Sequence, residues 1–248
     1  MPCWRGVGRT WNDLGARNPL GAILTRGGVL PTWTLEEFLA TGRADAARFM
    51  ADLERLAPTT GRRRALDFGC GIGRIARALT DHFDEVVGVD AAASMIHRAR
   101  QLNADCKRCT FVLNRASHLR SFPSATFDVV YSRLVLQHIR PSIVRRYVPE
   151  LIRVLAPGGA LMFQLPEFPP VAGSWWKKRM PRIAIEQWRR TKHRFMRVRS
   201  TACVEMFGID RAEVEEMIHR AGGRLLAANA DRSHGAEGSG FEYWVTSA

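Results

Sequence analysis

ALDFGCGIGR, at residues 65–74, is the stretch that decides the fold of this chain. An apolar run that ends in three alternate glycines predicts a buried strand and a sharp turn, because glycine accepts positive φ and lets a ligand approach the backbone. A helix is then expected over residues 74–81. The position three beyond Gly71 is Arg74, so the dinucleotide-binding pattern G-x-G-x-x-G fails and a diphosphate cofactor is disfavoured.

Two carboxylates accompany this turn. Asp67 lies in the strand just before the glycines, where it would repel a phosphate but favour a ligand that bears an ammonium group. Asp90 ends the next apolar strand, at the position where α/β nucleoside sites accept hydrogen bonds from the two ribose hydroxyls. We therefore expect both carboxylates to bracket one nucleoside-binding crevice.

Short apolar runs alternate with helical patterns through the middle of the chain. This alternation predicts an α/β fold with a parallel, doubly wound sheet, whose ligand crevice lies at the carboxyl ends of its strands. Asp67, Gly69, Asp90, Asn114 and Ser132 fall at or near those ends. The predicted strands are 65–68, 85–89, 110–113, 127–132, 159–165, 224–230 and 242–246, and the predicted helices are one from about residue 34, then 44–56, 74–81, 93–103, 142–155 and 211–221.

Over residues 62–165 the order and spacing of motifs resemble those of the class I S-adenosylmethionine-dependent methyltransferases. The matching pieces are the glycine loop, DAAASM at 90–95, FDVVYS at 127–132, LQH at 136–138 and RVLAPGG at 153–159. The resemblance implies a Rossmann-like sheet of seven strands, mostly parallel with an antiparallel last strand, and S-adenosyl-L-methionine as the cofactor. It also implies methyl transfer to an O, N or C nucleophile of a small-molecule or lipid-like acceptor.

The same resemblance implies a set of site residues. Met95 would pack on the adenine. Many members carry an acidic residue near the adenine amine, whereas this chain has Asn114, so the Asn114 side chain or the backbone of the next two residues would take that place. His138 is the candidate catalytic base, because its unperturbed pKa of about 6.5 suits proton removal at neutral pH. In the alternative interpretation, Gln137 and His138 brace the loop or shape the acceptor pocket. The predicted cofactor contacts are Asp67, Gly69, Cys70, Gly71, Gly73, Asp90, Ala91, Met95, Asn114, Arg115, Ala116 and Ser132.

We expect a single methyltransferase domain with four parts. Residues 1–58 would form a helical lid region, with Trp33, Phe38 and Gly42 as its candidate contacts, although these residues also suit a role in pinning the helices to the core. The remaining parts are the cofactor-binding core at 62–166, a basic substrate-recognition insertion at 167–205, and the last helix with the closing strands at 206–248.

Composition limits the class of protein. Hydrophobic residues make up 46% of the 248 positions, which is enough for a full core. The sequence has neither a signal-like amino terminus nor a run long enough to span a bilayer, which predicts a cytoplasmic protein. Five cysteines, an odd number, do not suggest a disulfide framework. Cys106 and Cys109 have C-x-x-C spacing without a second pair, so we interpret them as an ordinary loop and expect no metal site.

Most of the net charge of +13 is concentrated in residues 177–199, which hold ten Lys and Arg residues against one Glu. Trp175, Trp176 and Trp188 are interleaved with this basic segment. A cap over an anionic or aromatic small molecule is the favoured interpretation, and contacts with anionic lipid or nucleic acid are alternatives. An RNA or protein methyltransferase, and a cofactor-binding partner subunit without catalytic activity, therefore stay open as alternative functions.

Overall fold

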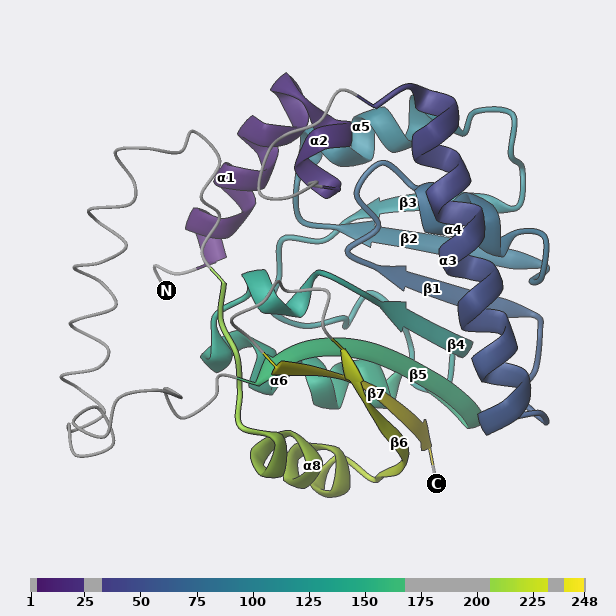
Figure 1. Ribbon diagram of the computed structural model, residues 1–248, viewed down its shortest axis with the longest axis vertical. Coiled ribbons are helices and arrows are strands. Elements are labelled where there is room, and N and C mark those ends of the chain that lie inside the picture. The colour runs from purple at the N-terminus through teal and green to yellow at the C-terminus, as the bar shows by residue number, and fades with distance from the viewer. Residues whose placement is uncertain (1–3, 25–32, 168–205, 232–238, 248) are drawn as a thin grey trace, which may run out of the picture.

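The computed structural model describes residues 4–24, 33–167, 206–231 and 239–247 (Figure 1). Seven strands form one sheet in the order β3-β2-β1-β4-β5-β7-β6, in which β7 alone runs antiparallel to its neighbours. This confirms the predicted seven-stranded α/β sheet with an antiparallel last strand. The strands are β1 (Arg64–Phe68), β2 (Glu85–Asp90), β3 (Cys109–Leu113), β4 (Phe127–Ser132), β5 (Leu155–Glu167), β6 (Gly223–Asp231) and β7 (Ser239–Ser247).

Helices cover both faces of the sheet. On one face α3 (Leu35–Leu56), α4 (Arg74–Leu79) and α5 (Ala93–Leu102) bury an apolar cluster, in which Phe49 stacks on Trp244 with ring centroids 5.2 Å apart. On the other face α6 (Pro141–Arg153) and α8 (Arg211–Arg220) cover a second cluster, built around Tyr147 and Phe163. The two clusters hold the strands in a buried layer, so the loops at the carboxyl ends of the strands stand on a rigid base. The basic segment 177–199 and its flanking tryptophans lie outside the described residues.

One predicted break between helices is wrong. Where the sequence predicts two helices, one from about residue 34 and one over 44–56, the structure has the single helix α3. Thr34 begins it with a capping box, in which its hydroxyl oxygen accepts the Glu37 N–H at 3.2 Å and the Glu37 carboxylate accepts the Thr34 N–H at 3.0 Å. Gly42 does not end the helix. A Cβ at that position would lie 2.5 Å from the carbonyl oxygen of Arg74, so this glycine serves close packing of α3 on α4.

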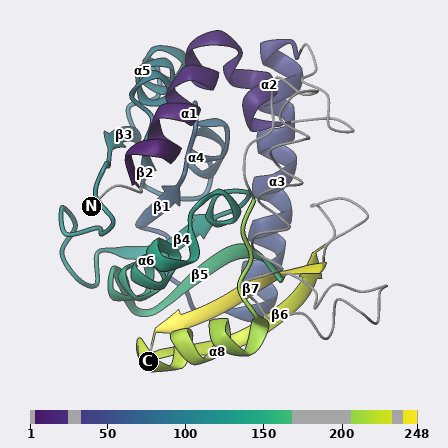
Figure 2. The same ribbon diagram turned by 90° about the vertical axis from the view of Figure 1, so that its left-hand side faces the viewer.

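Two helices near the amino terminus are absent from the sequence-based prediction. They are α1 (Trp4–Arg17) and α2 (Pro19–Ile23). Viewed toward the carboxyl ends of the central strands, α1 lies in front of α5 and the strand ends (Figure 2). The described residues include no helix that combines the length and the apolar character needed to cross a membrane.

Candidate functional site

The glycine loop turns tightly between β1 and α4. Gly69, Gly71 and Gly73 have φ values of 83°, 55° and 87°, the left-handed region that other residues rarely adopt. A Cβ on Gly69 would also lie 2.2 Å from the Val135 side chain. Backbone conformation and close packing both require glycine here, so the Val135 side chain can pack directly on the loop backbone at the carboxyl end of β1.

Asp90 is tied to this loop. One carboxylate oxygen, Oδ2, accepts the Gly71 N–H at 3.0 Å, and the other, Oδ1, accepts the Ala92 N–H at 2.8 Å. Burial raises the pKa of Asp90, and the backbone N–H groups of Ala92 and Gly71 act in the opposite direction. The side chain is partly exposed, and each oxygen keeps further acceptor capacity. Asp90 is thus a fixed, two-oxygen acceptor at the end of β2.

Asp67 lies deeper than the sequence suggests. Its side chain is 3% exposed, and its carboxylate accepts the Ala76 N–H at 3.0 Å, in the first turn of α4. Burial raises its pKa to about 7, and the guanidinium of Arg74 opposes that shift. The Asp67 side chain therefore bonds the end of β1 to the first turn of α4, and its contact with a ligand ammonium stays a prediction.

Beyond β3, the side chain of Asn114 organises its own loop. Its carbonyl oxygen accepts the Ala116 N–H at 3.1 Å, and its amide nitrogen donates to the His118 carbonyl at 3.0 Å. Tyr147 donates its hydroxyl proton to the Ala116 carbonyl. These bonds leave the Leu113 side chain, 38% exposed, as the apolar surface at the end of β3. The adenine contact by the Asn114 side chain, or by the backbone of the next two residues, stays a prediction.

Met95 and Ser132 are both buried. Met95 is 1% exposed, in a cluster with Ile72 and Phe38 beneath the amino-terminal helices. Ser132 is fully buried at the end of β4, and its hydroxyl has no hydrogen-bond partner among the described residues. The next residue, Arg133, turns toward α3 and pairs with Asp45 at 3.2 Å. Cofactor contacts by Met95 and Ser132 stay predictions.

The helices α1 and α2 lie within residues 1–58, where the sequence predicts a helical lid region but does not locate these two helices. The Trp11 ring packs edge-on against the His138 imidazole, with centroids 5.1 Å apart. Ile23 lies so close to the glycine loop that a Cβ on Gly71 would fall 2.7 Å from its Cδ1. The only sequence signal for this arrangement is the amphipathic pattern of residues 4–17. We define these two helices as the amino-terminal cap.

The predicted lid candidates make packing contacts. Phe38 is fully buried, and Gly42 packs on the backbone of Arg74. Trp33 donates its indole N–H to the Leu24 carbonyl at 3.0 Å. These contacts suit the alternative interpretation, in which the residues pin the helices to the core, and their role in a lid stays a prediction.

A side chain of α1 caps the amino terminus of α5. Ala92 precedes α5 without a capping side chain, and Asn12 of α1 accepts the Ser94 N–H at 3.0 Å instead. We expect Asn12→Ala to lower the free energy of unfolding by about 1 kcal/mol, measured by urea denaturation. Asp13→Ala, an exposed position on the same helix, is the control. Equal stability of the two variants would contradict this capping role.

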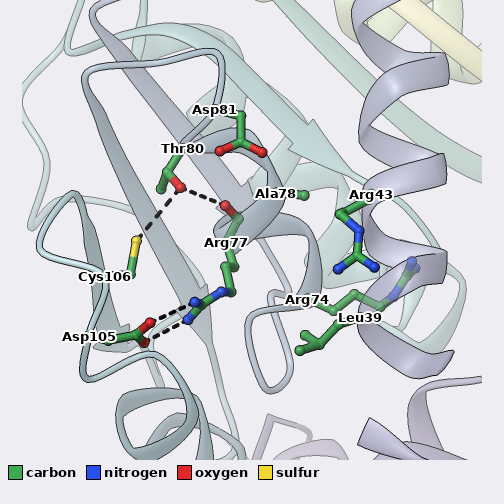
Figure 3. A pocket seen from close by; sticks show the side chains of 9 residues that line it. All are labelled: Leu39, Arg43, Arg74, Arg77, Ala78, Thr80, Asp81, Asp105 and Cys106. Carbon is green, nitrogen blue, oxygen red and sulfur yellow. Dashed lines mark hydrogen bonds and ion pairs between the residues drawn. The ribbon is translucent and has the colours of Figure 1, made fainter. Parts of the chain in front are cut away.

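A separate pocket of about 260 Å³ lies on the outer side of α4 (Figure 3). Arg77 and Asp105 form a two-pronged ion pair across it, with both N–O distances 2.7 Å. The Cys106 thiol donates to the Thr80 hydroxyl oxygen at 3.6 Å, and Cys106 and Cys109 are free thiols. None of the predicted cofactor contacts lines this pocket, and among the described residues no cluster of His, Cys, Asp or Glu side chains suits a metal ion.

Comparisons with known proteins converge on one domain type. Residues 66–163 match the family model described as a methyltransferase domain. The trans-aconitate 2-methyltransferase of Azoarcus sp. is 32% identical over 142 residues, which are 55% of this chain and 52% of that protein. The 2-methyl-6-phytyl-1,4-hydroquinone methyltransferase of Synechocystis sp. is 33% identical over 140 residues, 55% of this chain and 42% of that protein. The chain thus spans about half the length of these curated relatives.

Among solved structures, the fold is similar to that of a magnesium protoporphyrin IX methyltransferase from Synechocystis with bound SAH. The TM-score is 0.65, and the match covers 99% of each chain at 14% sequence identity. At that identity the likeness concerns the fold. The matched family region, residues 66–163, contains the glycine loop, Asp90, Ser132 and His138, but not the amino-terminal cap.

Proposed function

We propose that this chain is a class I S-adenosylmethionine-dependent methyltransferase, which transfers the methyl group of S-adenosylmethionine to a nucleophile of a small molecule. The match of residues 66–163 to the methyltransferase domain model and the similarity to small-molecule methyltransferases support this proposal. The observation that carries the proposal is the Asp90 carboxylate, which the N–H groups of Gly71 and Ala92 hold at the mouth of the glycine loop. We further propose that the chain works as one domain, with the boundaries predicted from its sequence.

The residues present fit this cofactor. The spare acceptor capacity of Asp90 suits the two ribose hydroxyls, and the exposed face of Leu113 suits a flat apolar base. The glycine loop is proposed to bind the methionine part through its backbone, beside the Val135 and Ile23 side chains that pack on Gly69 and Gly71. The cofactor supplies an activated methyl group. Alignment of the acceptor and exclusion of water are left to the protein, and such positioning accounts for about 7–11 kcal/mol of barrier lowering in general.

The acceptor is proposed to enter beside His138 and Trp11. These side chains belong to different segments, the short 3-10 helix η1 (Leu136–His138) and α1, and their contact forms one wall beyond the end of β4. His138 is the proposed catalytic residue, because it is half-buried there and has a titratable ring. The hydrogen-bond partners of His138 decide which of its two ring nitrogens carries the proton.

Calorimetric titration of the purified chain with S-adenosylmethionine, S-adenosylhomocysteine and NAD tests the cofactor assignment. We expect saturable binding of both adenosyl compounds and none of NAD. A radiolabelled methyl-transfer screen follows, with trans-aconitate, a prenylated hydroquinone, phosphoethanolamine and a malonyl thioester, the acceptor classes named by the relatives. Binding without transfer to any acceptor class would favour the non-catalytic partner subunit, and absence of adenosyl binding would overturn the proposal.

The basic segment 177–199 stays a candidate contact for an anionic acceptor, an anionic lipid or a nucleic acid. Binding to nucleic acid would weaken steeply as salt rises, because each phosphate contact releases counterions. A titration with single-stranded RNA at two salt concentrations therefore tests the RNA alternative, and absence of binding at low salt would remove it. The cytoplasmic location remains a prediction.

A further inference from the structure

A buried side-chain amide lies beside the β4 loop. Gln164 of β5 is fully buried, and its Oε1 accepts the Leu134 N–H at 2.9 Å. Leu134 directly follows the end of β4 and has a φ of 61°, a left-handed conformation that is uncommon for this residue type. A backbone N–H only donates, so the atom that faces it must be the carbonyl oxygen of Gln164. The orientation of this amide is therefore settled by the backbone.

That orientation determines the next two hydrogen bonds. The Gln164 amide nitrogen faces Gln137 Oε1 at 3.4 Å and donates to it. Gln137, itself buried, then points its own amide nitrogen at His138 Nε2, 3.0 Å away. An amide NH₂ group has no acceptor capacity, so His138 Nε2 has to be the acceptor. We name this series of Gln164, Gln137 and His138 the amide relay.

The amide relay selects one form of the imidazole. A neutral histidine carries its proton on one ring nitrogen only, so an accepting Nε2 places the proton on Nδ1. Protonation of Nε2 would set two donors against each other at 3.0 Å in a mostly buried site. The edge contact with Trp11, and the Phe207 N–H bond to the Gln137 carbonyl at 2.7 Å, hold the ring and its segment in place.

We propose that Gln164 and Gln137 are positioning residues that hold His138 as its Nδ1–H tautomer. The Nε2 lone pair of His138 is committed to Gln137, which disfavours a role as general base through that atom. The consequence for catalysis rests on the proposed function, whereas the tautomer is a property of the free protein.

Long-range ¹H–¹⁵N correlation spectra of the ¹⁵N-labelled full chain at pH 8 report the tautomer directly. His138→Phe identifies the His138 signals by their loss. We expect the wild-type chain to show an unprotonated Nε2 and a protonated Nδ1. The exposed His97 on α5 serves as an internal reference. A wild-type spectrum with the proton on Nε2 would overturn the proposal whether or not the chain has methyltransferase activity.

Gln164→Glu should reverse the relay. A carboxylate at this position still accepts the Leu134 N–H but donates nothing, so Gln137 turns its NH₂ group toward the carboxylate and its oxygen toward His138. We expect the ring proton to move from Nδ1 to Nε2. Gln101→Glu, the same change at an exposed position on α5, should leave the His138 spectrum unchanged. An Nδ1–H tautomer in folded Gln164→Glu would contradict the relay.

Gln137→Glu provides an independent test if Gln164→Glu does not fold. It retains an acceptor for the Gln164 amide and places a carboxylate beside Nε2, so it too should move the proton to Nε2. An Nδ1–H tautomer in folded Gln137→Glu would likewise contradict the relay.

Discussion

Asp90→Asn is expected to weaken S-adenosylmethionine binding at least 100-fold. The substitution replaces one carboxylate oxygen by an NH₂ group, which cannot accept a hydrogen bond from the Gly71 N–H, the Ala92 N–H or a ribose hydroxyl. Hydrogen bonds to a charged group contribute about 1.5–3 kcal/mol each, and every 1.4 kcal/mol changes affinity about tenfold. Isothermal titration calorimetry of both proteins measures the difference.

Glu85→Gln is the matched control for this experiment. Glu85 is the first residue of β2, and Asp90 is the last. The Glu85 carboxylate pairs with Arg64 at 2.8 Å, at the amino ends of the strands and away from the glycine loop. The same loss of a carboxylate at position 85 should leave cofactor affinity within about twofold of the wild type. The lost surface ion pair contributes only about 0–1 kcal/mol to the free energy of unfolding and does not contact the cofactor site. Equal affinity of Asp90→Asn and Glu85→Gln would exclude Asp90 from the cofactor site.

Asp67→Asn is expected to remove a large pH dependence of stability. Burial raises the pKa of Asp67 to about 7 in the folded chain, from an ordinary value of 3.8. Between these values the folded state binds the proton that the unfolded state releases, so the stability from this group is present below pH 3.8 and is lost as pH rises through about 7. Over the whole window the loss amounts to as much as about 4 kcal/mol.

The asparagine at position 67 keeps an oxygen for the Ala76 N–H but carries no charge. Urea denaturation at several pH values should therefore show a flatter profile for Asp67→Asn and greater stability than the wild type at pH 8. Asp81→Asn, an exposed carboxylate just beyond α4, should reproduce the wild-type profile. Parallel profiles for Asp67→Asn and the wild type would show that Asp67 titrates normally in the folded chain.

Local sequence signals predicted the cofactor side of the molecule. The glycine loop, the apolar runs on either side of it and Asp90 at a strand end are features of neighbouring residues, because positive φ and strand burial depend on residue type and short-range pattern. All seven strands lie close to their predicted positions, although β5 begins earlier, at Leu155, through an irregular register beside Phe127.

Long-range packing decided the acceptor side. Gly42 suggests a break by itself, and only its contact with the Arg74 backbone explains why α3 continues through it. Asn12 caps α5 across 82 residues of sequence, a relation that no local pattern contains. The sequence predicts a helical region over residues 1–58, but it does not reveal which of its helices contact the glycine loop and His138.

The sequence alone determined the sheet, the glycine loop and the carboxylate of Asp90, because strand periodicity and glycine conformation act within a few residues. The tertiary structure decided which side chains meet. Pairing of Ser132 with Phe163 in the parallel β4–β5 register brings Gln164 beside Leu134, and from there the direction of each hydrogen bond follows as far as His138. The direction of these hydrogen bonds depends on which donor faces which acceptor in space, and the identity of the residues alone does not specify it.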